Sequence, residues 1–322
     1  MKIFRHYDEV PGALKRAVVA VGNFDGVHLG HQALIAEARR QAMDRSRPLA
    51  VLAFEPHPAE FFRPRPDSIR LTPLRTKARL LAELGVDAMF ALTFDETMAT
   101  RSAESFVTDV LINGLGLSGV VVGPDFEFGK GRGGNVGTLK EMGTANGFTT
   151  TCFDMVRTAG EKISSTRIRD NLKAAHPEEA ARLLGRFWAV EARVEHGDGR
   201  GRRMGFPTAN MHLGHCLAPA FGIYAVRVTI TENEKPIGRH DGVANFGIRP
   251  MYQTPVPLME AHLFDFDGDL YGKHLSVELI AYLRPEAKFD SLDALIAQIG
   301  ADAQKARKIL ARTPRAPETG RS

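Results

Sequence analysis

The first half of the chain alternates between short apolar runs and amphipathic segments. The runs have the length of buried strands, and they lie at 17–21, 49–54, 88–94, 120–123 and 149–153. Segments with helical spacing of apolar residues lie between them, at 31–43, 73–84 and 102–112. Strands that alternate with helices predict a doubly wound α/β fold, in which helices cover both faces of a parallel sheet. Ligands of such sheets bind beyond the carboxyl ends of the strands.

From about residue 186 the pattern changes to strands that follow one another directly. Such segments are FWAVEARVEH, GIYAVRVTI, LMEAHLFDF and LSVELIAYL. Turns rich in glycine and proline separate them, and the sequence DGD at 267–269 is typical of a hairpin turn. An amphipathic helix at 291–311 follows, and its apolar face is formed by Leu292, Leu295, Ile296 and Ile299. This order predicts an antiparallel β-barrel with a C-terminal helix.

The change of pattern also predicts where the domains lie. With 322 residues, the chain is too long for one ordinary hydrophobic core. We expect a first domain at 1–176 and a second domain at 186–312. The segment PEEAARLLG at 177–185 has the pattern of a helical linker, and 313–322 has the composition of a flexible tail.

Composition indicates the cellular compartment in which the protein works. Cys152 and Cys216 are the only cysteines, so we expect no disulfide framework, and a reducing cytoplasm fits. Charges and a proline interrupt the first twenty residues, unlike a signal peptide, and no run of roughly eighteen apolar residues predicts a membrane span. We therefore expect a soluble cytoplasmic protein with no membrane partner. The net charge of +4 suits an anionic small molecule as well as a nucleic acid.

The segment VGNFDGVHLGHQ at 21–32 joins an apolar run to a helical pattern and holds two histidines. From their spacing, His28 and His31 are zinc ligands, bystanders in a turn, or phosphate-binding groups. A zinc site needs a third ligand, and none is evident nearby. For a phosphate, a helix N-terminus supplies backbone N–H groups and a positive dipole end, and two imidazoles add donors. Asn23 is a further donor, and Asp25 is either a turn former or a residue that binds magnesium or orients the turn.

The segment ISSTRIRDNL at 163–172 places hydroxyls and guanidiniums at a predicted helix start. A single serine there is most simply a helix cap. Three hydroxyls and two guanidiniums favour a polyphosphate site instead, formed by Ser164, Ser165, Thr166, Arg167 and Arg169. The stretch GKGRGG at 129–134 matches a dinucleotide fingerprint only formally, because it does not open a helix directly after a strand. The chain contains no P-loop motif.

Together, GNFDGVHLGHQ and ISSTRIR resemble the motifs of the HxGH nucleotidyltransferase superfamily. With FEPHP at 54–58 and VVGPDFEFGKGRGG at 121–134, the first half is similar to the FMN adenylyltransferase module of bacterial bifunctional riboflavin kinase/FAD synthetases. The resemblance implies that the phosphate of FMN attacks the α-phosphate of ATP, and that pyrophosphate leaves. It also implies that His28 and His31 stabilise the transferring group without a covalent intermediate, and that the triphosphate is held by Ser165, Thr166 and Arg169.

The same resemblance implies roles for residues outside these two motifs. Asn23 fits the nucleotide site. His57 and Asp125 are expected to lie near the flavin or ATP. Pro124 and Glu127 depart from the pattern of the family, which concerns flavin contacts rather than the reaction.

In the second half, the segment GRGRRMGFPTANM at 199–211 joins a basic, glycine-rich loop to a proline. Pro207 restricts Phe206 to an extended conformation, and in an extended chain Thr208 and Asn210 face the same way. A hydroxyl and an amide oxygen are ligands that Mg²⁺ accepts. A bare TxN is far more often a polar strand edge, but the arginines of this segment favour a loop that covers phosphates.

The segment PLMEAHL at 257–263 has alternating faces. Glu260 and His262 share one face, and the other, apolar face is formed by Met259, Ala261 and Leu263. A glutamate on such a face is usually only solvated. If the face overlooks Thr208 and Asn210, Glu260 can accept a proton from a substrate hydroxyl, with positioning compensating for its low basicity.

The second half is similar to the riboflavin kinase module of the same family, whose PTAN motif stands at Pro207–Asn210. The resemblance implies a six-stranded barrel and transfer of the γ-phosphate of ATP to the ribityl hydroxyl of riboflavin. It implies Thr208 and Asn210 as magnesium ligands and Glu260 as the catalytic base.

Two positions of the second half depart from the pattern of the family. In GVANFGIRPMY at 242–252, Met251 stands where the family has threonine, and Ala261 replaces the threonine expected after the glutamate. Both departures concern flavin contacts, and neither removes a proposed catalytic group. The resemblance spans about residues 15–310.

We therefore expect a bifunctional enzyme that converts riboflavin to FMN and FMN to FAD with ATP. One alternative is a chain with one active and one decayed module. Another is a flavin- or RNA-binding regulator that uses the barrel as a binding module. An RNA-binding barrel needs exposed aromatic residues between its basic ones, and Trp188 is the only tryptophan, so we expect no nucleic-acid partner. The sequence leaves the oligomeric state open.

Overall fold

The computed structural model describes residues 1–62, 68–154, 156–158, 160–197, 201, 204–232, 235–248 and 257–314. Contacts divide the chain into two compact units. The first comprises Met1–Pro66 and Arg70–Ser165, and the second comprises Asp67–Ile69 and Thr166–Ser322. The arginines expected in the loop at 199–203, Met251 and most of the C-terminal tail lie outside the described residues.

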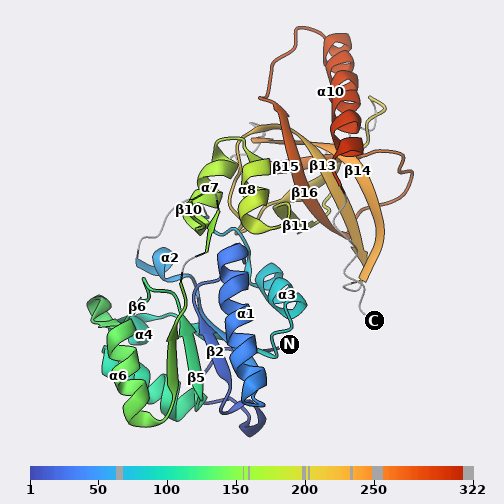
Figure 1. Ribbon diagram of the computed structural model, residues 1–322. Coiled ribbons are helices and arrows are strands. Elements are labelled where there is room, and N and C mark those ends of the chain that lie inside the picture. The colour runs from blue at the N-terminus through green and yellow to red at the C-terminus, as the bar shows by residue number, and fades with distance from the viewer. Residues whose placement is uncertain are drawn as a thin grey trace. The chain divides into compact units, whose positions relative to one another are not determined.

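The first unit is built on a six-stranded parallel sheet with the order β1-β4-β3-β2-β5-β8 (Figure 1). Its strands are β1 (Lys2–Phe4), β2 (Val18–Val21), β3 (Leu49–Glu55), β4 (Ala88–Thr93), β5 (Gly119–Val122) and β8 (Thr149–Cys152). The apolar runs thus form the expected strands, because strands buried on both faces need continuous hydrophobic sequence. The short edge strand β1 was not predicted.

Helices cover both faces of this sheet and create two separate cores. One core lies under α1 (Leu29–Asp44) and α3 (Leu74–Glu83). The other lies under α5 (Ala103–Ser105), the π-helix η2 (Phe106–Leu115) and α6 (Val136–Asn146). Shorter elements are α2 (Pro58–Phe62), α4 (Glu96–Thr100), β6 (Glu127–Phe128), β7 (Gly134–Asn135), β9 (Arg157–Thr158), β10 (Glu161–Lys162), η1 (Gly12–Leu14) and η3 (Lys130–Arg132). The doubly wound prediction is confirmed.

The strand order reverses at β2, and this places the first candidate site. After β2 the chain builds β3 and β4 on one side and later returns to add β5 on the other side. Helices that leave the two sides cover opposite faces, and in such folds ligands bind at the carboxyl ends of the strands where the order reverses. The glycine-containing turn at 22–28 lies there.

The second unit is a six-stranded antiparallel sheet with the order β11-β16-β13-β14-β15-β12. Its strands are β11 (Ala189–Arg193), β12 (Ala209–His212), β13 (Gly222–Glu232), β14 (Lys235–Ile248), β15 (Pro257–Leu263) and β16 (His274–Arg284). A single bridge between Glu195 and Asn210 joins the two edges, which closes the sheet into the predicted barrel.

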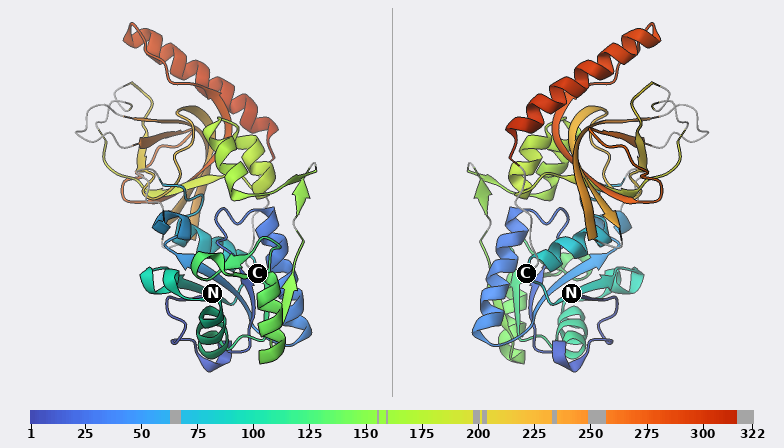
Figure 2. Two further views of the ribbon diagram at one scale, coloured as in Figure 1. Left: turned by 90° about the vertical axis from the view of Figure 1, so that its left-hand side faces the viewer. Right: turned by 90° about the vertical axis from the view of Figure 1, so that its right-hand side faces the viewer.

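The barrel is accompanied by α7 (Ser165–Lys173), α8 (Pro177–Leu184) and α10 (Leu292–Arg312), and Figure 2 shows α10 alongside the barrel strands. The expected apolar face of α10 is partly wrong. Leu292 is 58% exposed, and the residues that α10 buries lie one to five turns later, at Asp302, Ala306 and Leu310. Periodicity shows that a helix has an apolar side, but only packing decides which turns reach the sheet.

The hairpin expected at 267–269 is also wrong. In the barrel β13 and β14 separate β16 from β15, so the loop at 264–273 crosses between strands that are not neighbours. Turn residues mark a change of direction but do not determine which strands pair. This loop instead lines a cavity beside β12.

Candidate functional sites

The turn at 22–28 in the first unit is held in an unusual backbone conformation. Phe24 and Val27 have φ values of 49° and 43°, and Gly26 has a φ of 85°. Left-handed backbone at residues other than glycine is retained only where surrounding contacts hold it. Phe24 supplies one such contact, because its side chain is fully buried in the core under α1.

Asp25 provides the main polar anchor of this turn. Its carboxylate is 2% exposed and accepts hydrogen bonds from the backbone N–H of Leu71 at 2.9 Å and of Thr72 at 3.0 Å. The Thr72 hydroxyl in turn accepts from the N–H of Gly26 at 2.9 Å. These contacts favour an orienting role for Asp25. Burial lowers the pKa of the neighbouring Lys77 ammonium, and the Asp25 charge opposes that shift.

His28 and His31 meet at the N-terminus of α1. His28 is the N-cap residue, and its Nδ1 accepts a hydrogen bond from the backbone N–H of His31 at 3.2 Å. The two rings stack with centroids 3.6 Å apart and planes inclined by 15°. Because Nδ1 of His28 accepts, its ring is neutral and carries the proton on Nε2. The pair therefore combines a helix N-terminus with imidazole donors at one point.

Gly30 is required by this ring stack. A Cβ at position 30 would lie 3.1 Å from Cε1 and 3.2 Å from Nδ1 of the His28 ring. The ring of Phe24 lies 5.2 Å from that of His31 and supports the stack from the core side. The H-x-G-H spacing therefore has a local steric reason.

Other predicted residues of the first site are distributed over three loops. The Ser165 hydroxyl donates to the carbonyl of Asp25 at 2.8 Å, which ties the start of α7 to the histidine turn. Asn23 is half-buried in that turn. His57 caps α2 by accepting from the N–H of Ala59 at 3.0 Å, and Asp125 binds Lys162 at 2.7 Å. His57 and Asp125 follow the carboxyl ends of β3 and β5, on the same sheet edge as the turn.

Thr166 and Arg169 belong to the second unit. Both lie on α7, and the Arg169 Nε donates to the carbonyl of Ile69 at 2.6 Å. The expected contact of these two residues with a triphosphate stays a prediction.

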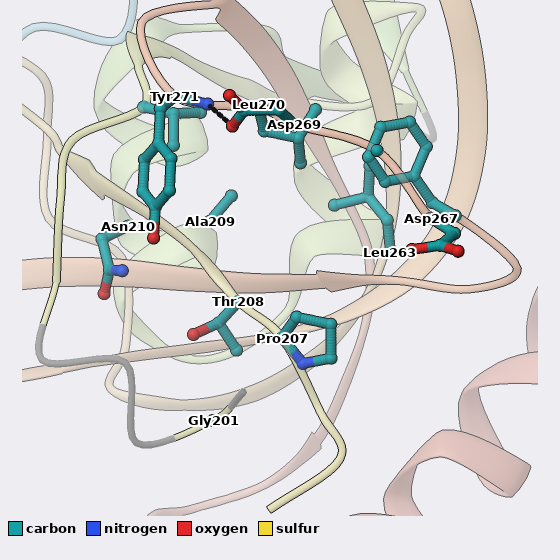
Figure 3. Close-up of a pocket in the computed structure, with 13 residues that line it drawn as sticks. Gly201, Pro207, Thr208, Ala209, Asn210, Leu263, Asp267, Asp269, Leu270 and Tyr271 are labelled. Carbon is teal, nitrogen blue, oxygen red and sulfur yellow. Dashed lines mark hydrogen bonds between the residues drawn. The ribbon is translucent and has the colours of Figure 1, made fainter. Parts of the chain in front are cut away.

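In the second unit, a cavity of about 150 Å³ opens beside β12 (Figure 3). Thr208 and Asn210 line it, together with Asp267, Asp269 and Tyr271 of the crossing loop. In Figure 3 the side chain of Tyr271 extends toward Asn210. Sequence reasoning missed these loop residues because they were interpreted as a hairpin turn.

The cavity offers hard oxygen donors of the kind that Mg²⁺ prefers. Thr208 supplies a hydroxyl, Asn210 an amide oxygen, and Asp267 and Asp269 carboxylates. Among the described residues, no group of three or more His, Cys, Asp or Glu side chains is arranged to hold a metal ion. A magnesium ion at this cavity would therefore need further ligands from water or substrate phosphates.

Close packing positions the two expected magnesium ligands. A Cβ on Gly197 would lie 2.3 Å from Nδ2 of Asn210, so only glycine leaves room for this amide. His262 Nδ1 lies 2.8 Å from the carbonyl oxygen of Pro207. Because a carbonyl only accepts, the ring donates from Nδ1 and holds the segment that leads into Thr208.

Strand register brings Glu260 beside Asn210. Glu260 pairs with Asn210 of β12 on one side and with Asn245 of β14 on the other. The three residues form a row across three strands, on the face opposite to the buried Met259 and Ala261. Glu260 therefore shares a face with Asn210, although it is not among the residues that line the cavity, and its role as a base stays a prediction.

Comparisons with known proteins agree in both halves. The chain matches the FAD synthetase family model over residues 11–167 and the riboflavin kinase family model over residues 184–310. It is 40% identical over 314 residues to the bifunctional riboflavin kinase/FMN adenylyltransferase of Escherichia coli (strain K12), covering 97% of this chain and 99% of the relative. It is 39% identical over 312 residues to the protein of that name from Pseudomonas fluorescens, with coverages of 97% and 98%.

A crystal structure from Streptococcus pneumoniae named macrolide-efflux protein has the same fold. It superposes with a TM-score of 0.83 at 29% identity, covering 95% of this chain and 98% of that one. In the part of the chain that the structure describes, we find no helix long and apolar enough to cross a membrane.

Proposed function

Because the chain belongs to the family of bifunctional riboflavin kinases/FMN adenylyltransferases, we propose that its two reactions take place at the two sites described above. The enzyme phosphorylates riboflavin with ATP to FMN, and it adenylylates FMN with ATP to FAD with release of pyrophosphate. We assign FAD formation to a domain at 1–176 and FMN formation to a domain at 186–312, with 177–185 as a helical linker and 313–322 as a tail.

The stacked histidine pair carries the assignment of the adenylyltransferase site. An oxygen of the FMN phosphate attacks the α-phosphorus of ATP, and the bond to the pyrophosphate oxygen breaks. Negative charge grows on the transferring group in the transition state. His28 and His31 donate hydrogen bonds to it, and the N-terminus of α1 adds its dipole.

Further groups hold the substrates of this reaction. Asn23 binds the nucleotide, and the triphosphate is held by Ser165, Thr166 and Arg169. His57 and Asp125 lie near the flavin or ATP. Asp25 acts indirectly, because its hydrogen bonds to Leu71 and Thr72 hold the turn that carries His28.

At the kinase site, Glu260 accepts the proton of the terminal ribityl hydroxyl as that oxygen attacks the γ-phosphorus of ATP, and ADP leaves. Thr208 and Asn210 hold Mg²⁺, which neutralises phosphate charge when bound. The pairing of Asn210 with Glu260 on neighbouring strands supports this assignment, because it brings an amide and a carboxylate side by side.

We further propose that the enzyme works in the cytoplasm on small-molecule substrates, with no nucleic-acid partner. The free cysteines Cys152 and Cys216 fit a reducing compartment.

Two variants test both assignments in one time course. His28→Asn keeps an N-cap acceptor while removing the imidazole, and Glu260→Gln keeps the shape of the side chain while removing the base. Each is incubated with riboflavin, ATP and Mg²⁺, and the flavins are separated by chromatography. We expect His28→Asn to accumulate FMN without FAD. Glu260→Gln should leave riboflavin unchanged and still convert supplied FMN to FAD. Wild-type rates in either variant would refute the corresponding assignment.

A further inference from the structure

Asn245 on β14 carries a buried amide oxygen that has no hydrogen-bond partner in the described part of the barrel. Its amide Oδ1 is buried, and it makes no hydrogen bond among the residues that the structure describes. Asn245 lies in the continuous part of β14, paired with Ile223 of β13 and Glu260 of β15. A buried acceptor without a donor costs folding free energy, and most such groups in proteins are paired. A donor group that arrives with a ligand would satisfy it.

The neighbours of Asn245 show what that partner must be. Ala244 and Phe246 are fully buried on the opposite face of β14, so Asn245 does not fill the barrel core. Beside it on β13, Ile223 packs with the apolar cluster under α10. On its other side, β15 places Glu260 opposite Asn245. Because Oδ1 can only accept, its partner must be an O–H or N–H group or a cation.

The positions of Asn210, Glu260 and Asn245 on neighbouring strands favour one of these partners over the others. Asn210, Glu260 and Asn245 lie on consecutive strands, about 4.8 Å apart. The proposed metal ligands lie on the far side of Glu260 from Asn245, which disfavours a metal at Asn245. When the terminal hydroxyl of a polyol lies at Glu260, its next hydroxyls can reach Asn245, because the two residues are separated by one strand spacing.

We propose that Asn245 is a substrate-binding residue of the kinase, which accepts a hydrogen bond from a secondary hydroxyl of the ribityl chain of riboflavin. This inference rests on the proposed role of Glu260 as the base for the terminal hydroxyl. The contact orients the chain so that the terminal hydroxyl faces Glu260. It also gives the site selectivity for polyhydroxylated side chains, because a site built to pair with a hydroxyl rejects an analogue that lacks it.

The test is a cycle of two enzymes and two substrates. The enzymes are the wild type and Asn245→Leu, which replaces the amide with an apolar group of similar size. The substrates are riboflavin and its 10-(5-hydroxypentyl) analogue, which keeps the terminal hydroxyl and the flavin ring but lacks the secondary hydroxyls. Equilibrium binding is measured by flavin fluorescence, and turnover by chromatography. Asn245→Ala repeats the cycle without adding branched bulk.

We expect Asn245→Leu to lower the affinity for riboflavin and its kcat/KM by about 10-fold. The wild type should lose a similar factor on the analogue, and the variant should lose nothing further on it. The KM for ATP should stay unchanged. Equal losses of the variant on both substrates would overturn the proposal, since they indicate a contact with the ring or a general structural effect. An unchanged affinity for riboflavin in both variants would overturn it as well.

A second readout separates a binding role from a structural one. Trp188 is buried in the second unit and is the only tryptophan, so its fluorescence reports the unfolding of the barrel. Asn245→Leu should not lower the melting temperature of the ligand-free protein, because no hydrogen bond is lost. It should reduce the rise in melting temperature that riboflavin produces. A destabilised ligand-free barrel with an unchanged riboflavin shift would contradict the proposal.

Failure of the base assignment can be distinguished from failure of this inference. If Glu260→Gln retains wild-type turnover, the role of Glu260 is wrong. The binding cycle at Asn245 involves no proton transfer, so it still decides whether the amide contacts a secondary hydroxyl.

Discussion

The two candidate sites are assembled in opposite ways. In the first, His28, Gly30 and His31 come from one turn, and capping and stacking between sequence neighbours build the site. In the second, Asn210, Glu260 and Asn245 come from three strands and meet only through the register of the barrel. A motif of adjacent residues therefore describes the histidine pair of the first site, whereas the PTAN motif describes only one edge of the second.

The sites also differ in how their polar groups are satisfied before substrate arrives. At the first site, the Asp25 carboxylate and the His28 Nδ1 already accept backbone hydrogen bonds. At the second, the Asn245 acceptor has no partner in the described part of the chain. We infer that the turn that carries His28 is preorganised, while Asn245 completes its hydrogen bonding with substrate. Both use one glycine to admit a functional side chain, Gly30 for His28 and Gly197 for Asn210.

The largest loss of activity is expected at Asn210, the proposed magnesium ligand of the second site. Asn210→Leu removes the proposed amide ligand while keeping the volume of the side chain. We expect a fall in riboflavin kinase kcat/KM of at least about 100-fold and a higher Mg²⁺ concentration for half-maximal rate, because phosphate charge is less well neutralised. Conversion of supplied FMN to FAD should continue at the wild-type rate and serves as the internal control. A parallel loss of both activities would show that the sites are not independent.

The second prediction tests whether Asp25, which anchors the turn of the first site, is needed to hold that turn in place. Asp25→Ala leaves the N–H groups of Leu71 and Thr72 without their acceptor, and we expect a loss of about 2 kcal/mol in the stability of that unit. Hydrogen exchange followed by mass spectrometry should show faster exchange at these two amides. Asp44→Ala, at an exposed aspartate of α1, is the matched control. Unchanged protection at Leu71 and Thr72 would mean that the anchor is not needed.

A substitution at Gly30 changes the geometry of the first site less than the loss of the Asp25 carboxylate does. Gly30→Ala places a methyl group 3.1 Å from the His28 ring, which must shift by a few tenths of an ångström. We expect FAD formation to fall by about 10-fold with riboflavin kinase activity unchanged. The control is Gly12→Ala, since a Cβ there meets no atom within 4 Å. Equal activities of the two variants would show that the stacked arrangement is not required.

The smallest expected effect concerns how the stability contributed by Glu37, on the helix that carries His31, changes as the pH falls. Hydrogen bonds from Arg40 and Gln41 lower the pKa of Glu37 from 4.5 to about 2. The folded state thus favours ionised Glu37, and this stabilisation is present above pH 4.5 and is lost as the pH falls toward 2. At pH 7, Glu37→Gln should lower the melting temperature by less than about 2 °C, because Arg40 is exposed. The difference from the wild type should shrink on acidification, and a constant difference would contradict this origin.

Much of the molecule follows from the sequence through local rules. Continuous apolar runs specify the buried parallel strands, and alternation within 257–263 places Glu260 opposite a core face. Ser102 caps the helix that begins at Ala103, and its hydroxyl accepts from the N–H of Ser105 at 3.1 Å. The helix beyond it continues as a π-helix, which periodicity did not predict. These features depend on residues a few positions apart, so a pattern can encode them.

Only the tertiary structure decides what depends on pairing between distant segments. The anchoring of Asp25 by Thr72, the crossing path of the loop at 264–273, and the row of Asn210, Glu260 and Asn245 all join residues far apart in the chain. Many registers satisfy the same alternation of polar and apolar residues. The packed barrel selects one of them, and that choice places Glu260, the proposed base, between Asn210 and Asn245.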